Sequence, residues 1–156
     1  MNTISIRKAT LDEFPLVVSL VGALLKELGA EGDEAGKLAV EQLASLARQG
    51  GDRHIAFLAF DADDSPIGVL TLAESMAIYA KGHYGIINEM FVAPEFRSTG
   101  VGARLIAAAV AESKSRGWRR IDVTAPESLV WAPTRRFYEQ QGFTFTGPKM
   151  KLLLEE

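Results

Sequence analysis

The spacing of apolar and polar side chains predicts a strand and two helices in the first fifty residues. Residues 4–9 alternate apolar and polar side chains, as in a strand with one buried face. Residues 11–29 place apolar side chains three and four positions apart, which is the spacing of one helix face, after Thr10 as a candidate N-cap. Residues 35–50 repeat that spacing and end at a pair of glycines.

The rest of the chain alternates strands with helices. Two of the strands flank a turn rich in Asp and Pro, which is a hairpin pattern. The predicted elements are the strands 54–61, 66–75, 85–94 and 119–125, the helices 101–117 and 133–142, and a closing strand pair within 143–154. The order is β-α-α-β-β-β-α-β-α-β-β, and its strand–helix–strand unit implies a locally parallel pair with a right-handed crossover. The sequence therefore predicts a mixed α/β sheet.

Length and composition favour one soluble domain over residues 1–156. The chain has 156 residues, of which 47% are apolar and 24% charged, with no internal repeat and no linker-like tract. No apolar run approaches the roughly 18 residues of a membrane span. Acidic residues interrupt the N-terminal stretch where a secretion signal would be apolar, so a cytoplasmic location is expected.

Charge and residue types narrow the classes of partner. The net charge of −3 offers no general attraction to nucleic acid phosphates and suits a cationic partner better. The chain has no cysteine, which excludes disulfides, thiolate metal sites and a cysteine nucleophile. Its two histidines do not favour a histidine-rich metal site. No metal, nucleic acid or membrane partner is therefore expected.

A glycine-rich join between a strand and a helix carries the strongest local signal. Segment 97–102 reads RSTGVG and lies between the apolar run of residues 85–94 and the predicted helix that follows. The first N–H groups of a helix have no internal partner, and glycines let a bulky anion approach them. No Gly-Lys-Ser/Thr follows, and Leu105 stands where a dinucleotide fingerprint needs glycine. The loop is thus either a phosphate-type anion site or a plain tight turn.

Two motifs resemble those of the GCN5-related N-acetyltransferase (GNAT) family. RSTGVG is similar to the family's Arg/Gln-x-x-Gly-x-Gly/Ala element, and RRFYEQQGF at residues 135–143 is similar to its late tyrosine-containing helix. The order of elements is similar across nearly all of the chain. The resemblance implies a central mixed sheet of about seven strands with helices on both faces, a single N-acetyltransferase domain, and acetyl-CoA as cosubstrate.

The resemblance also implies which residues would hold acetyl-CoA. The pyrophosphate is expected on the backbone N–H groups of Arg97, Ser98, Thr99, Gly100, Val101 and Gly102, and the pantetheine arm on backbone groups of Met90, Phe91 and Val92. The Arg97 guanidinium can add a charge-assisted contact. One departure concerns an asparagine that commonly precedes the late helix. Seven residues before Tyr138 this chain has Trp131, which leaves that contact open and could instead wall the acceptor pocket or pack in the core.

Acyl transfer from a thioester to an amine needs a base for the amine and an acid for the departing thiolate. Glu89 is the only carboxylate in the run GIINEMFV and is the first choice of base, acting through water; an ion-paired or idle glutamate is the alternative. Tyr138 matches the family tyrosine that protonates the thiolate, with core packing as its alternative. His83 is a second candidate base, whereas His54 opens a strand and is interpreted as structural.

The loops around such a site are expected to choose the acceptor. Segments 29–36 and 74–85 contain acidic residues that could attract a cationic amine, with ordinary solvated charges as the alternative. The first hypothesis is an acetyl-CoA-dependent N-acetyltransferase acting on a small-molecule or protein amine. The second is a non-catalytic module that binds acyl-CoA and changes a partner contact. Homodimers recur among similar proteins, so a homodimer is compatible with the resemblance.

Overall fold

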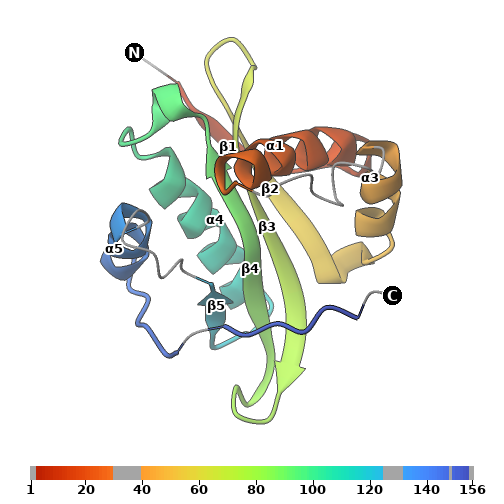
Figure 1. Ribbon diagram of the computed structural model, residues 1–156, viewed down its shortest axis with the longest axis vertical. Helices are drawn as coiled ribbons and strands as arrows, with labels where there is room; N and C mark the ends of the chain where they lie inside the picture. The colour runs from red at the N-terminus through yellow and green to blue at the C-terminus, as the bar shows by residue number, and fades with distance from the viewer. Residues whose placement is uncertain (1–2, 30–39, 125–131, 148, 155–156) are drawn as a thin grey trace. The chain divides into compact units, whose positions relative to one another are not determined.

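A five-stranded sheet and four α-helices make up the described part of the chain (Figure 1). The computed structural model describes residues 3–29, 40–124, 132–147 and 149–154. The strands are β1 (Ser5–Lys8), β2 (His54–Phe60), β3 (Pro66–Ala77), β4 (Gly82–Val92) and β5 (Ile121–Val123). The helices are α1 (Phe14–Glu27), α3 (Val40–Arg48), α4 (Val101–Ser115) and α5 (Ala132–Gln140), with the 3-10 turns η1 (Leu11–Glu13), η2 (Gly51–Arg53) and η3 (Pro94–Phe96).

The strands lie side by side in chain order, β1-β2-β3-β4-β5. The first three pairs, from β1–β2 to β3–β4, are antiparallel. The sheet as a whole is mixed, which confirms the predicted α/β class. Contacts divide the chain into two compact units, Met1–Asp122 and Val123–Glu156. The first unit holds most of the sheet with α1, α3 and α4, and the second holds α5.

The prediction of about seven strands was wrong, because the closing strand pair is not formed. Residues 143–147 and 149–154 have no helix or strand. Met150, Leu152 and Leu154 are 90%, 84% and 89% exposed. Side chains that bury so little apolar surface contribute little to offset the entropy of ordering a backbone into a strand. The apolar residues of this segment therefore suggested strands that the described chain does not contain.

The hairpin of β3 and β4 is longer than predicted and takes up most of segment 74–85. Ser75, Met76 and Ala77 pair with Tyr84, His83 and Gly82 in that order. The turn between the strands closes with a 2.9 Å hydrogen bond from the Lys81 N–H to the Ile78 carbonyl. Lys81 and Gly82 have φ angles of 61° and 128°, so a left-handed turn ends the ladder. Much of the predicted acceptor loop is thus part of the sheet.

The first α-helix begins later than the sequence predicts, because a 3-10 turn comes before it. Thr10 caps the turn η1, and α1 begins only at Phe14. The Glu13 carboxylate accepts hydrogen bonds from the Thr10 N–H at 2.9 Å and from the two terminal nitrogens of the Arg7 guanidinium, each at 2.6 Å. Gly29, with φ of 73°, follows the end of α1 as predicted. The helix predicted over 35–50 is seen as α3, and residues 35–39 lie outside the described residues.

The two faces of the sheet are covered by different helices. Residues paired directly across two strands point their side chains to the same face. Val69 of β3 and its partner Phe91 of β4 pack with Phe14 and Val17 of α1. Gly68 lies on the opposite face, where a β-carbon would stand 3.3 Å from the side chain of Leu105 in α4. Helices on both faces confirm that part of the predicted fold, with α1 and α3 side by side on one of them.

Candidate functional site

The join between β4 and α4 places glycine where only glycine is unstrained. The chain leaves β4 through η3, and Gly100 then caps α4 with φ of 92°. A β-carbon at Gly100 would meet no atom within 4 Å, so the space beside this residue is open. Ser98 also has a left-handed φ of 65°. The predicted glycine loop is therefore a curled segment with an open side at a helix start.

The start of α4 offers unpaired hydrogen-bond donors. The Arg104 N–H donates to the Gly100 carbonyl at 3.1 Å, which begins the helical pattern. The N–H groups before it, from Val101 to Ala103, have no carbonyl four residues back within the helix. The helix dipole adds partial positive charge at the same point. A phosphate or diphosphate fits this combination of open space and donors.

Arg97 is already engaged within the protein. Its Nε donates to the Val92 carbonyl at 2.9 Å, and its guanidinium contacts the Glu27 carboxylate at 2.7 Å. The guanidinium also lies over the Phe91 ring, 5.6 Å from the centroid. Arg97 therefore links the loop to the end of β4 and to the last residue of α1. Sequence analysis did not predict the contact with Glu27, because the two residues are 70 positions apart.

Glu89 lies at an irregularity in β4. Thr71 pairs with Glu89, but the next residue, Leu72, pairs with Ile87, so Asn88 is an extra residue in β4. Such a bulge bends the strand and re-aims its side chains. The Glu89 N–H donates to the Thr71 hydroxyl oxygen at 3.0 Å, and the Thr71 hydroxyl donates to the Glu89 carboxylate. The predicted base is thus held at a bulge, on the sheet face covered by α1.

The residues expected to face the pantetheine arm continue β4 beyond the bulge. Met90, Phe91 and Val92 pair with Leu70, Val69 and Gly68 of β3. On the other side, the Gly85 N–H donates to the Arg120 carbonyl at 3.1 Å, just before β5. β5 has three residues against eleven in β4. The described β5 is therefore too short to pair with the far end of β4 as well.

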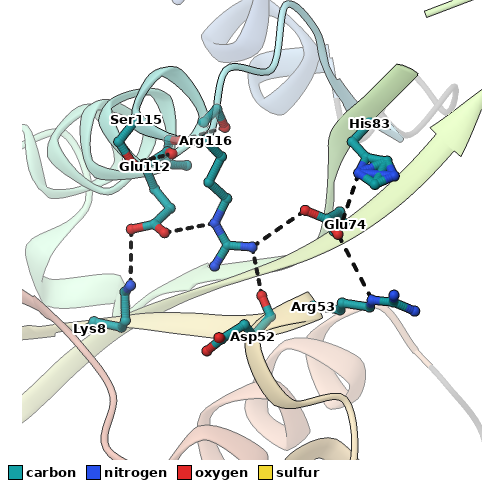
Figure 2. A network of polar contacts seen from close by, with 10 residues as sticks. Lys8, Asp52, Arg53, Glu74, His83, Glu112, Ser115 and Arg116 are labelled. Atoms are coloured by element: carbon teal, nitrogen blue, oxygen red, sulfur yellow. Dashed lines mark hydrogen bonds and ion pairs between the residues drawn. The ribbon is translucent and has the colours of Figure 1, made fainter.

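His83 lies on the opposite face of the sheet from Glu89. It pairs with Met76, whereas Glu89 pairs with Thr71, an odd number of positions away along β3. The Glu74 carboxylate lies between His83, Arg53 and Arg116 (Figure 2). The nitrogen–oxygen distances to these three residues are 3.8, 4.0 and 3.7 Å in that order. Glu74 and His83 therefore belong to this network and not to the face that holds Glu89.

His54 is the other histidine, and it lies on the same sheet face as Glu89. It pairs with Ala73, and its ring centroid is 6.2 Å from that of Phe14. Its Nδ1 is buried and has no hydrogen-bond partner in the part of the chain that the structure describes. Gly50 packs against it so closely that a β-carbon there would stand 2.6 Å from the His54 β-carbon. This packing agrees with the structural interpretation of His54.

Two tyrosines, Tyr79 in the turn between β3 and β4 and Tyr84 in β4, form a pair next to the sheet face that holds Glu89. Tyr84, which pairs with Ser75, is buried on that face, and its hydroxyl lies 3.1 Å from the hydroxyl of Tyr79. The Arg120 guanidinium lies 4.8 Å from the centroid of the Tyr79 ring and contacts the Asp122 carboxylate at 2.6 Å. The predicted acceptor loop thus presents polar and aromatic groups on this face.

Tyr138 belongs to the second unit and is buried there. It is 7% exposed, whereas the neighbouring Phe137 is half-buried, so Tyr138 packs among other side chains of its unit. The rings of Phe137 and Phe143 lie edge-on, with centroids 5.5 and 5.7 Å from that of Tyr138. Burial raises the pKa of Tyr138 to about 12. Its phenol therefore keeps its proton at any physiological pH.

A protein-family model now decides the class of the protein. The model described as the Acetyltransferase (GNAT) family matches residues 29–143. The chain belongs to the GNAT family. This GNAT domain therefore combines a family-typical glycine loop with a carboxylate on the preceding strand. Trp131, which stands where the asparagine was expected, lies outside the described residues.

Solved structures share the fold of this GNAT domain. A predicted acetyltransferase of Clostridium acetobutylicum with acetyl-CoA has a TM-score of 0.77 at 22% identity, covering 97% of each chain. The aminoglycoside acetyltransferase meta-AAC0020 of an uncultured soil metagenomic sample, in complex with sisomicin, has a TM-score of 0.78 at 17% identity, covering 98% of this chain and 96% of the other. A transcriptional regulator of Bacillus halodurans has a TM-score of 0.79 at 21% identity, covering 97% and 100%. No curated protein sequence matches.

Among the described residues, no three histidine, aspartate or glutamate side chains are grouped in a way that could hold a metal ion. None of the helices in that part of the chain is both long and apolar enough to cross a membrane.

Proposed function

We propose that this GNAT domain transfers the acetyl group of acetyl-CoA to the primary amine of a small molecule. Acetyl-CoA supplies an activated thioester when it is bound. The loop from Arg97 to Gly102 would hold its diphosphate through backbone N–H groups at the start of α4. The open side of Gly100 supports this, because a bulky anion can approach there without meeting a β-carbon. Backbone groups of Met90, Phe91 and Val92 would hold the pantetheine arm.

The observation that best supports a catalytic function is the Glu89 carboxylate, which hydrogen bonds hold in place on the strand that leads into this loop. A protonated amine is a poor nucleophile, so a base must take its proton. Glu89 would do so through a water molecule. The amine nitrogen would then bond to the carbonyl carbon and the carbon–sulfur bond would break. The thiolate would take a proton from Tyr138, and the second proton lost by the amine nitrogen would pass through solvent to restore Tyr138. His83 is not proposed as the base, because it lies on the opposite sheet face.

The proposed class of acceptor amine is based on the net charge of the chain and on a solved structure of similar fold. The net charge of −3 favours a cationic molecule. A fold relative is named as an aminoglycoside acetyltransferase and was solved with sisomicin, an observation about that protein that motivates the choice here. The aromatic and polar groups of Tyr79, Tyr84 and Asp122 are proposed to line the acceptor side. A polyamine or an aminoglycoside is therefore the class to test first.

Thiol release tests this proposal. Acetyl-CoA should raise the melting temperature, and at least one amine in a panel of aminoglycosides, polyamines, amino acids and peptides should release free CoA thiol. Glu89→Gln should lower kcat roughly 100-fold and Tyr138→Phe roughly tenfold, which is in the range for a lost general base or acid. The control Glu139→Gln removes an exposed carboxylate and should leave kcat unchanged.

Two results would redirect the proposal. Stabilisation by acetyl-CoA without thiol release from any amine would favour a non-catalytic acyl-CoA-binding module. No stabilisation by acetyl-CoA or CoA would overturn both functions.

A further inference from the structure

Thr71 is an exceptional residue in the core of the first unit. It is 2% exposed, and apart from aromatic residues it and Ser113 are the only buried polar residues in the described part of the chain. The Ser113 hydroxyl donates to the Ala109 carbonyl at 2.7 Å, one turn back in its own helix. The Thr71 hydroxyl instead bonds to a different strand, at Glu89. The buried Thr71 hydroxyl, in the middle of β3, therefore hydrogen-bonds to the residue opposite it on β4.

The Thr71 hydroxyl uses both of its hydrogen-bonding capacities on Glu89. A hydroxyl has one proton to donate and lone pairs to accept with. Here it accepts the Glu89 N–H at 3.0 Å and donates its proton to Glu89 Oε1. The first bond fixes the backbone beside the bulge, and the second fixes the side chain. One buried atom thus sets both the position and the direction of the carboxylate.

The bulge explains why such a bond is needed. The extra residue, Asn88, breaks the ladder between β3 and β4, so backbone pairing alone does not hold the chain at this point. A hydroxyl on β3 replaces the missing partner. It also leaves the two carboxylate oxygens unequal, because Oε1 accepts the Thr71 proton while no partner for Oε2 occurs among the described residues.

We infer that Thr71 is a positioning residue for the general base, an inference that rests on the function proposed above. By holding Oε1, Thr71 presents Oε2 to the water or amine that gives up a proton. Without the hydroxyl the carboxylate samples other rotamers, and the rate of proton removal falls. Binding of acetyl-CoA stays the same, because the glycine loop is unaffected. A purely structural hydroxyl would instead alter stability without acting through Glu89.

Steady-state kinetics of Thr71→Val and Thr71→Ser separates these roles. Valine keeps the shape of threonine and removes the hydroxyl, whereas serine keeps the hydroxyl. Thr71→Val should lower kcat roughly tenfold with KM for acetyl-CoA within about twofold of wild type, and Thr71→Ser should recover most of the rate. In a Glu89→Gln background, Thr71→Val should change kcat less than about twofold, because its target is gone. Ser113→Ala, the matched loss of a buried hydroxyl, should leave kcat unchanged.

Each outcome has one meaning. Unchanged kcat in Thr71→Val, an equal loss in Thr71→Ser, or a full further loss in the Glu89→Gln background overturns the positioning role while leaving the proposed function intact. A wild-type protein that releases no thiol overturns the proposed function and the positioning role with it. If Thr71→Val does not fold, Thr71→Ala is measured against Thr71→Ser, and equal kcat values contradict the inference.

Discussion

Gly100 offers a way to separate the shape of the loop from its capacity to bind an anion. Gly100→Ala adds one β-carbon at φ of 92° into open space. With no clash, the loss of stability comes from the left-handed backbone, which costs a non-glycine residue about 1 kcal/mol. For a chain of this size that corresponds to a melting temperature lower by about 3 °C. The new methyl group also stands on the open side where we propose that the diphosphate approaches.

Gly117 provides the matched control at the other end of the same helix. It has φ of 79°, and a β-carbon there also meets nothing within 4 Å. It follows the end of α4, roughly 20 Å from the loop at 1.5 Å per helical residue. Gly117→Ala should therefore lose the same stability of about 1 kcal/mol, again from its left-handed φ. Its affinity for CoA should not change.

Urea unfolding without ligand and calorimetric titration with CoA measure the two effects separately. Both variants should lose similar stability, whereas only Gly100→Ala should bind CoA about tenfold more weakly, a difference of about 1.4 kcal/mol. Titration is carried out at a temperature where all three proteins are folded. Equal dissociation constants for Gly100→Ala and Gly117→Ala would refute the assignment of this loop as the anion cradle. Unchanged stability in both variants would refute the backbone argument.

Two further predictions concern stability and pH. The Arg7 guanidinium, and then the Thr10 N–H, lower the pKa of Glu13 from 4.5 to about 2, so the contribution of Glu13 is present above pH 4.5 and is lost as the pH falls through 2. Because this pair is partly exposed, Glu13→Gln should cost only about 1 kcal/mol at pH 7 in urea unfolding; a difference from wild type that persists at pH 2 would contradict this. Burial raises the pKa of Tyr138 from 10.0 to about 12, so the native state keeps a proton that the unfolded chain loses. Relative to Tyr138→Phe, the wild type should lose about 1.4 kcal/mol of stability per pH unit between pH 10 and 12, and parallel curves for the two proteins would argue against a buried phenol.

Features that depend on neighbouring residues were predictable from the sequence. The apolar spacing of residues 101–117 indicated α4, and Gly100 indicated a turn at its start, whereas Gly102 lies in the first turn of the helix. The preference for glycine at position 100 is a local effect, because a left-handed φ favours glycine wherever it occurs. Together with the later tyrosine motif, this local pattern was sufficient to predict the GNAT family. The predicted closing strands failed because apolar residues form a strand only where other segments cover them.

Features that depend on pairing between distant segments were decided by the tertiary structure alone. The sequence marked Glu89 as a carboxylate in an apolar strand, but its bond to Thr71 requires the register of β3 and β4 and the extra residue at the bulge. The same register places His83 on the other face of the sheet and so separates the two candidate bases. Side-chain faces alternate with every residue, so a shift of one position reverses them. The sequence therefore marked the candidate groups for the proposed chemistry, and the pairing register of the sheet determined which of their side chains point to the same face.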